Sequence, residues 1–264
     1  MGKKIRIMTF NIKNSRDYSN PKNIWLNRKN RVLKIIKKYK PDIIGFQEVY
    51  EDQLEFLNNN LPEYKYEGVG RDDGIRAGEF CPIFYRELEI KNSGTFWLSD
   101  TPNTCSNTWG GLFRICTWIN FINDIPFAVY NTHFENTKSS IRLKSISLVI
   151  SKIDNYSPNQ PIILSGDLNF GRNSEEYLKL SQYLRETYSI QDKKFRWAVT
   201  AHGFKGKKRS ILSWNGRSII DYIWVNSSIK IQNTQIIHDN PGKDPSIFPS
   251  DHWPIISDLS IDNP

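Results

Sequence analysis

Short apolar runs separated by polar clusters and turn residues make up most of this chain. Runs of strand length occupy residues 5–11, 43–48, 82–85, 116–121, 127–132, 162–165, 219–225 and 255–259. Apolar residues recur at helical spacing over residues 25–40, 50–61, 141–153 and 174–184. Because residues 82–132 hold several strands with no helix between them, we expect a layered α/β protein. Two sheets packed as a sandwich with helices outside fit this order better than an alternating parallel sheet.

No repeat, low-complexity tract or Ser/Gly-rich linker divides the sequence, so we expect one domain over residues 1–264, acting as a monomer. The three cysteines have neither the spacing of a zinc site nor an even count, which favours free thiols in a reducing compartment. No apolar segment is long enough to span a membrane, and the start lacks the apolar region of a signal peptide. We therefore expect no transmembrane segment and a cytoplasmic location, while secretion with a removed leader stays open.

The net charge of +8 favours capture of anionic substrates without saying which anion. Part of the excess lies in residues 28–40, where apolar residues at helical spacing make the solvated face of an amphipathic helix the simplest interpretation. A second basic run, residues 205–209, lies in a Gly-containing stretch without apolar periodicity. A loop with that much charge is the better candidate for touching phosphates.

Polar clusters stand at the ends of the apolar runs. They are Asn11, Gln47-Glu48, Asn131-Thr132-His133, Gly166-Asp167-Leu168-Asn169, Asp221 and Ser250-Asp251-His252. Acid, amide and imidazole groups that separate strands bring to one place predict a metal-dependent hydrolytic site. Core packing alone does not produce this pattern.

Two of the clusters carry carboxylates with more than one interpretation. If strand geometry continues past residue 167, Asp167 and Asn169 face one cleft, where the acid takes a proton from water and the amide donates to an anionic oxygen. A simple turn is the alternative, since these residue types favour turns. Glu48 ends an apolar run and needs a partner. That partner is either a hard divalent cation, Mg²⁺ or Mn²⁺, or an arginine.

Two of the four histidines, His133 and His252, also lie in these clusters. Position beside polar residues at a strand end favours a ligand or phosphate-contacting role over a structural one. Asp221 lies within an apolar strand and is placed to hydrogen-bond His252, which would favour the cationic imidazole. That cation would stabilise charge on a pentacovalent phosphate, and a structural salt bridge is the alternative.

The order of these motifs, from Asn11 to His252, resembles the endonuclease/exonuclease/phosphatase (DNase I-like) superfamily. The resemblance implies a four-layer α/β sandwich, with two mainly antiparallel sheets face to face and helices outside. It implies Glu48 as the main metal ligand, with Asn11 and Asp251 close to the ion. It also assigns catalytic or substrate-binding roles to other residues: Asp167 for the attacking water, Asn169 for a phosphate oxygen, His252 with Asp221 for the developing charge, and His133 and Asn131 for the substrate.

The chain departs from part of that pattern. Relatives that cut at abasic sites carry an acid two residues after the first Asn, where this chain has Lys13, so that ligand is not transferred. Residues 78–86, 93–99 and 114–118 are similar instead to an uncharacterised bacterial branch nearer the deadenylases and sphingomyelinases. From these stretches we expect Arg86 or Arg114 to reach the substrate phosphate, with a structural ion pair as the alternative for either.

These observations predict a Mg²⁺- or Mn²⁺-dependent phosphoesterase acting on a diester in preference to a monoester. The substrate class stays open between nucleic acid, a phospholipid head group and a small metabolite. If the substrate is a lipid, Trp97 and Trp109 are candidate interfacial anchors. The alternatives are a phosphomonoesterase on a small phosphorylated metabolite or inositol phosphate, and an inactive phosphate-binding module. The carboxylates of Glu48, Asp167 and Asp251 argue against the inactive module. A protein that only binds an anion gains nothing from three negative groups around it.

Overall fold

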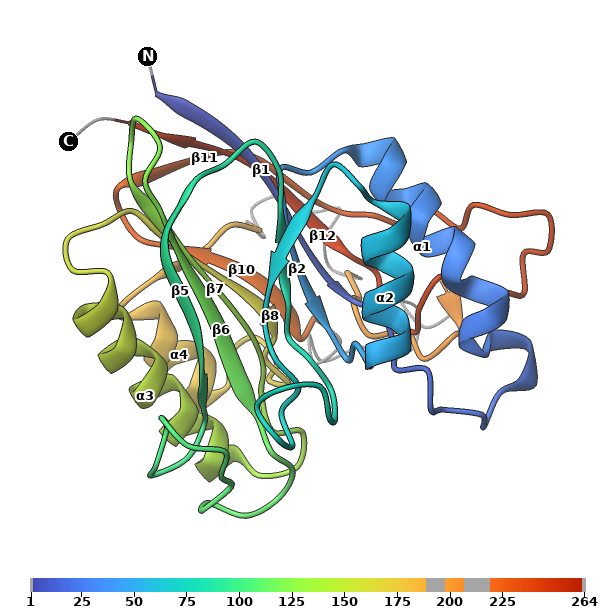
Figure 1. The fold of residues 1–264 in the computed structure, drawn as a ribbon, viewed down its shortest axis with the longest axis horizontal. Coiled ribbons are helices and arrows are strands. Elements are labelled where there is room, and N and C mark those ends of the chain that lie inside the picture. Colours follow the sequence, from blue (N-terminus) through green and yellow to red (C-terminus); the bar gives the residue numbers. More distant parts are fainter. Residues whose placement is uncertain (1, 189–197, 207–218, 263–264) are drawn as a thin grey trace.

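The computed structural model describes residues 2–188, 198–206 and 219–262. Within these ranges the strands form two six-stranded sheets. The sheets pack face to face, with α1 and α2 outside one of them and α3 and α4 outside the other (Figure 1). The predicted α/β sandwich with outer helices is confirmed.

The first sheet has the strand order β11-β12-β1-β2-β4-β3. Its strands are β1 (Lys3–Asn11), β2 (Ile43–Gln47), β3 (Lys65–Glu67), β4 (Ile83–Tyr85), β11 (Ile229–Ile236) and β12 (Ile255–Ile261). Only β1 and β2 pair in parallel, and the chain between them forms η1 (Pro21–Asn23) and α1 (Trp25–Tyr39). Helix α2 (Glu51–Asn60) follows β2 and packs beside α1 on the outer face.

The second sheet repeats this plan in the order β5-β6-β7-β8-β10-β9. Its strands are β5 (Ile90–Trp97), β6 (Ile115–Phe121), β7 (Phe127–His133), β8 (Ile162–Asp167), β9 (Arg185–Glu186) and β10 (Asp221–Val225). Here β7 and β8 form the parallel pair, joined by α3 (Ser139–Tyr156), and α4 (Glu175–Ser181) follows β8. Each sheet therefore contains a parallel pair, and the helix that joins the pair covers the outer face.

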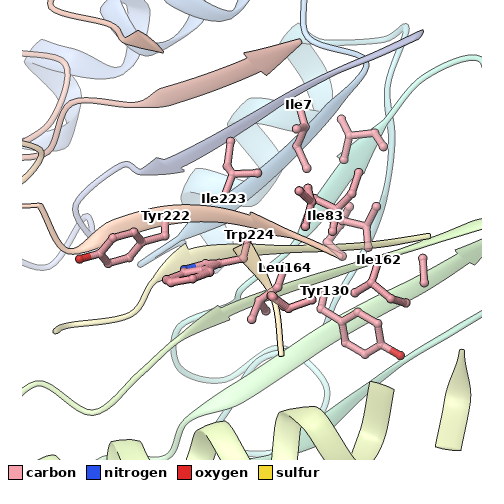
Figure 2. Packing of buried hydrophobic residues seen from close by; sticks show 14 of the residues in the cluster. Ile7, Ile83, Tyr130, Ile162, Leu164, Tyr222, Ile223 and Trp224 are labelled. Atoms are coloured by element: carbon pink, nitrogen blue, oxygen red, sulfur yellow. The ribbon is translucent and has the colours of Figure 1, made fainter. Parts of the chain in front are cut away.

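Side chains alternate between the two faces of each strand, so the apolar residues divide between the core that lies between the sheets and the core beneath the helices. Ile5 and Ile7 of β1 belong to the core that includes the space between the sheets, whereas Met8 and Phe10 pack with the helices α1 and α2. Figure 2 shows Ile223 pointing from β10 toward Ile7, with Trp224 on the opposite side of its strand. Both sheets are thus buried on both faces near their centres, which explains the near-continuous apolar runs in the sequence.

The strands that the sequence analysis missed lie mainly at sheet edges. β3, β5, β9 and β11 are edge strands, and many of their side chains are exposed and polar. Such strands lack the apolar pattern that a search for buried strands detects. Helix α4 ends at Ser181, short of the predicted residue 184. Of the basic run 205–209, residues 207–209 lie outside the described ranges.

Among the helices in the described part of the chain, none combines the length and the apolar content needed to cross a membrane.

Candidate active site

The interior between the sheets changes from apolar to polar toward one end. At that end β1 and β2 finish in the first sheet and β7 and β8 in the second, with Asn11 paired to Gln47 and His133 paired to Asp167. The buried polar residues there are Thr9, Asn11, Gln47, Asn131, His133, Ser165 and Asp167. Because two parallel pairs end at the same place, four strands deliver polar side chains to one region.

Asn131 holds the two sheets together in this region. Its amide nitrogen donates to the carbonyl oxygens of Phe46 at 2.8 Å and Pro82 at 3.1 Å, and its Oδ1 accepts from Gln47 Nε2 at 2.7 Å. The side chain is fully buried and lies against Gly45, where a Cβ atom would come within 2.5 Å of Asn131 Oδ1. These bonds occupy both ends of the amide within the protein, which favours a structural role for Asn131 over the predicted substrate-binding one.

Asn11 connects the acidic residues of the two sheets. Its Nδ2 donates to Glu48 Oε1 and to Asp167 Oδ2, each at 3.0 Å. The backbone oxygen of Asn11 accepts a 2.7 Å hydrogen bond from Ser250 Oγ, which joins the segment preceding His252 to the same point. Three distant parts of the sequence therefore contact Asn11, two of them through its amide side chain and one through its backbone.

Glu48 reaches Asn11 because its backbone leaves the strand geometry. Alternation along β2 would turn residue 48 toward the helices with Phe46, but Glu48 has a φ of 57°, in the left-handed region. Its Oε2 accepts from the backbone and side-chain nitrogens of Asn14 at 3.2 and 2.9 Å. Burial alone would raise the pKa of Glu48, but the neighbouring His133, the charge of Lys13 and the bond from Asn11 hold it below its ordinary value. The carboxylate is therefore ionised.

The pKa of Asp167 is shifted in the direction opposite to that of Glu48. Burial and the adjacent charge of Asp221, which stands opposite in the register of β8 and β10, raise the pKa of Asp167 to about 7. Strand β8 ends at Asp167, and Asn169 has a φ of 52°. The Asn169 backbone nitrogen donates to Asp167 Oδ1 at 3.1 Å. Of the two interpretations that the sequence left open, the turn is therefore the correct one, and the turn itself brings Asn169 beside the acid.

His252 forms a buried pair with Asp221. The distance from His252 Nδ1 to Asp221 Oδ2 is 2.8 Å, and Nδ1 is 3.9 Å from Asp167 Oδ2. Burial lowers the pKa of His252, but the Asp221 carboxylate outweighs it and raises the pKa well above 6.5. The imidazole is thus cationic at neutral pH. Since Nδ1 is occupied, Nε2 is the ring nitrogen left for a substrate oxygen.

His133 differs from His252 in its charge. Its Nε2 is 3.6 Å from Asp167 Oδ2, and its Nδ1 is buried without a hydrogen-bond partner in the described part of the protein. Burial, together with the positive charge of Arg114, lowers the pKa of His133 well below 6.5. The site therefore contains one neutral and one cationic imidazole.

The two arginines proposed for the substrate lie in different places. Arg114 directly precedes β6, is 5% exposed, and has Nε and one terminal nitrogen buried without partners among the described residues. Arg86 follows β4, whose last residue Tyr85 pairs with Ile43 at the start of β2, whereas Glu48 follows the end of β2. Arg86 is therefore at the opposite end of the sheet.

At that opposite end Arg86 has structural partners. It donates to the backbone oxygen of Lys40 at 3.0 Å and to Asp42 Oδ1 at 3.2 Å. The structural ion pair is thus the correct alternative for Arg86, and only Arg114 remains a candidate for the substrate. Trp97 is also excluded as an interfacial anchor, because it is 7% exposed and its Nε1 donates to the backbone oxygen of Arg71 at 2.7 Å.

The oxygen donors around Asn11 suit a hard divalent cation. Ligand atoms of Glu48, His133 and Asp167 lie within 4.8 Å of one another. Asp251 is close to Glu48, because Lys13 Nζ lies 3.9 Å from Asp251 Oδ2 and 3.6 Å from Glu48 Oε2. An ionised carboxylate with further carboxylates nearby is the kind of donor set that Mg²⁺ and Mn²⁺ prefer. A second group, Asp167, Asp221 and His252, is less suitable because its imidazole is cationic.

Arg28 of α1, which the sequence pattern assigned to a solvated helix face, is buried and contacts the segments next to the site. Arg28 of α1 is 1% exposed, and its guanidinium donates to the backbone oxygens of Ile12, Lys13 and Asn14 and to that of Pro249. Three of these carbonyls belong to the residues that directly follow Asn11 in the sequence. The fourth, that of Pro249, lies shortly before Asp251 and His252. Its spacing in an amphipathic helix gave no signal of this role, because the partners are backbone atoms far away in the sequence.

Comparison with known proteins agrees with the fold. The model of the Endonuclease/Exonuclease/phosphatase family matches residues 8–252, and the chain belongs to this family of phosphoester hydrolases. An uncharacterized protein of Acanthamoeba polyphaga mimivirus is 33% identical over 159 residues, which are 55% of this chain and 59% of the viral protein. The chain thus spans less than two thirds of that relative.

Solved structures of similar chains extend over the whole length. A crystal structure of an endonuclease/exonuclease/phosphatase family protein from Bacteroides thetaiotaomicron has a TM-score of 0.88 and 28% identity, covering 100% of both chains. A mannosyl-6-phosphatase from Bacteroides thetaiotaomicron VPI-5482 has a TM-score of 0.86 and 28% identity, covering 97% of this chain and 99% of its own. The predicted superfamily is confirmed.

Proposed function

We propose that the protein is a divalent-metal-dependent phosphoesterase in which water attacks the phosphorus atom directly. The observation that carries this proposal is the position of Asn11, whose Nδ2 is 3.0 Å from both Glu48 Oε1 and Asp167 Oδ2. That contact places an ionised carboxylate beside a carboxyl group with a pKa of about 7, and the cationic His252 adjoins the second of these. A site with these three properties contains a cation-binding group, a base and an acid.

Glu48, Asn11 and Asp251 would hold Mg²⁺ or Mn²⁺, in agreement with the ionised state of Glu48. When bound, the ion polarises a phosphoryl oxygen and orients the ester. Asn11 is fully buried and the side chains of Glu48 and Asp251 are mostly buried, which strengthens the electrostatic contacts among them.

Asp167 is the proposed general base. A pKa of about 7 is close to the operating pH, so the carboxylate form is populated while still being basic enough to accept a proton from water. The Asn169 backbone nitrogen fixes Oδ1 of Asp167, and Asn11 fixes Oδ2. Asn169 Nδ2 donates to the backbone oxygen of Phe134 at 3.0 Å, which keeps this amide beside the base, where it can face a phosphate oxygen.

His252 is the proposed donor to the phosphorane. Asp221 holds Nδ1, so the proton on Nε2 points to the developing negative charge. The pair need not move a proton to Asp221, because its task is to keep the ring oriented and cationic. His133, being neutral, would contribute a hydrogen bond without adding charge.

The choice between diester and monoester depends on Arg114. The sequence predicts a diester, but Arg114 has two buried nitrogens without partners and lies close enough to lower the pKa of His133. A monoester carries between one and a half and two negative charges near neutral pH, roughly one more than a diester, and so gains more from a free guanidinium. The similarity to a mannosyl-6-phosphatase points the same way. A phosphomonoesterase on a small metabolite is therefore the second candidate function.

Rates with aryl esters test both functions. With p-nitrophenyl phosphate and bis(p-nitrophenyl) phosphate as substrates, hydrolysis should require Mg²⁺ or Mn²⁺ and stop with EDTA. Asp167→Asn should lower kcat at least about a hundredfold, while Asp258→Asn, which removes a surface partner of Arg6, should not. Binding of phosphate without hydrolysis of any ester would establish the inactive binding module instead.

Arg114→Gln separates the two substrate classes. If the natural substrate is a monoester, this variant should lose far more activity on the monoester than on the diester. Equal losses on both esters would remove the support for a monoesterase and leave the diester as the better assignment.

A further inference from the structure

Lys13 places its ammonium group beside two of the carboxylates of the proposed cation site. We propose that its ammonium group takes the place of a second divalent cation, so that the site binds a single ion. This inference rests on the proposed metal-dependent function and concerns the number of ions that the site holds. It makes Lys13 a residue that sets metal stoichiometry.

The backbone of Lys13 is fixed before its side chain makes any contact. Its nitrogen donates to Asn11 Oδ1 at 3.0 Å, and its oxygen accepts from Gln53 Nε2 at 3.0 Å and from the Arg28 guanidinium. Its φ of 55° lies in the left-handed region, which a lysine adopts at a cost of about 1 kcal/mol. A strained position held by several hydrogen bonds indicates that the direction of this side chain matters.

The ammonium group lies among three carboxylates that come from different segments. Lys13 Nζ is 3.4 Å from Asp17 Oδ2, 3.6 Å from Glu48 Oε2 and 3.9 Å from Asp251 Oδ2. Only 21% of its side chain is exposed, so solvent does not fully screen the charge. Two of these carboxylates are the proposed ligands of the ion.

Charge balance explains the effect on stoichiometry. Without the ammonium, Glu48, Asp251 and Asp17 would present three acidic groups to one another, and a cation would relieve their repulsion. With the ammonium in place, one positive charge already lies within 4 Å of each, and a second divalent ion would meet it at close range. A first ion would be less affected, because the described contacts of the ammonium within 4 Å are with Asp17, Asp251 and the Oε2 atom of Glu48, and Asp167 is not among them.

Binding of Mn²⁺ without substrate tests this inference. Metal-stripped full-length protein is titrated with Mn²⁺, and free Mn²⁺ is followed by electron paramagnetic resonance. Wild type should bind one ion. Lys13→Met should bind its ion about tenfold more tightly or better, because a repelling charge is gone, and Lys13→Asp should bind two. Circular dichroism and melting curves establish that each variant is folded.

A matched control removes the same charge elsewhere. Lys91 is an exposed residue of β5, near Ile90, which pairs with Phe121 at the end of its sheet away from His133. Lys91→Met should leave both the number of Mn²⁺ ions and their affinity unchanged. A rise in affinity equal to that of Lys13→Met would reduce the effect to net charge and overturn the inference.

The outcomes also separate this inference from the proposed function. Wild type binding no Mn²⁺ would overturn the metal-dependent function and the inference with it. Wild type binding two ions, or a folded Lys13→Asp binding one, would overturn the inference and leave the function standing. If Lys13→Met leaves the Mn²⁺ affinity unchanged but raises KM, the inference is also overturned and the function stands. Lys13 would then be a substrate-binding residue.

Discussion

Asp167 of β8 stands directly opposite Asp221 of β10 in the antiparallel register of the two strands. Only one of these acids has a close cationic partner, since His252 Nδ1 is 2.8 Å from Asp221 and 3.9 Å from Asp167. The paired acid orients the imidazole, while the unpaired acid has its pKa raised to about 7 by burial and by its neighbour. Two identical side chains on adjacent strands thus acquire different tasks from their surroundings.

The raised pKa of Asp167 has a consequence for stability. Its ordinary value of 3.8 applies to the unfolded chain, so between that value and about 7 the folded protein keeps a proton that the unfolded chain has lost. Stability of the metal-free protein therefore falls as pH rises through this window. In Asp167→Asn this loss is absent. From about pH 5 to about pH 8 the variant should gain about 3 kcal/mol relative to wild type.

Urea unfolding in EDTA at both pH values measures this difference. Asp258→Asn serves as the control, because it disrupts an exposed ion pair that contributes little at either pH. A difference between wild type and Asp167→Asn that does not change with pH would show that Asp167 has no raised pKa.

Asp221→Asn should remove the cause of the high pKa of His252. Burial then dominates, so the pKa of His252 should fall from well above 6.5 to below it. Loss of the cationic imidazole should lower kcat by about a hundredfold or more. Proton-detected NMR of labelled histidine in wild type and in the variant, with His252→Gln for assignment, gives the pKa directly. An unchanged pKa in the folded variant would contradict the role of Asp221.

Arg28→Lys should affect both stability and the site. A lysine has one nitrogen in place of three and cannot reach the carbonyls of residues 12–14 and of Pro249 together, so buried carbonyls lose their donors. We expect a loss of about 3 kcal/mol and weaker Mn²⁺ binding, because the segments that carry Asn11 and Asp251 are released.

Arg31 provides the comparison for Arg28. It is also buried in α1, and its guanidinium holds the segment 240–247 through Asn240 Oδ1 and the backbone oxygens of Asp244 and Ile247. Arg31→Lys should lower the melting temperature without changing Mn²⁺ affinity. Equal changes of Mn²⁺ affinity in both variants would assign the effect of Arg28 to general destabilisation.

Much of the site could be predicted from the sequence because strand ends are local features. Asn11, His133 and Asp167 each finish an apolar run, and their side chains share the inner faces of the sheets with residues two positions earlier. That periodicity is set by the backbone and needs no knowledge of the fold. The sequence pattern did not show which apolar runs lie side by side as neighbouring strands. That order followed only from the resemblance to a known family.

The rest of the site depends on contacts that no local pattern encodes. Glu48 and Lys13 adopt left-handed conformations that neither residue type favours, so their side-chain directions could not be inferred. Asn131 and Arg86 were predicted to contact the substrate. In the structure, backbone oxygens of distant segments accept both hydrogen bonds of the Asn131 amide nitrogen, and Arg86 forms an ion pair with Asp42. Edge strands such as β5 were missed because a half-exposed strand carries few apolar residues.

The central claim is that Glu48, Asn11 and Asp251 hold one divalent ion beside Asp167. Crystals of the protein soaked in Mn²⁺ test it most directly, through the anomalous difference map. We predict one peak at a ligand distance of roughly 2 Å from a Glu48 carboxylate oxygen. No peak at this position, or a peak bound by other residues, would contradict the account.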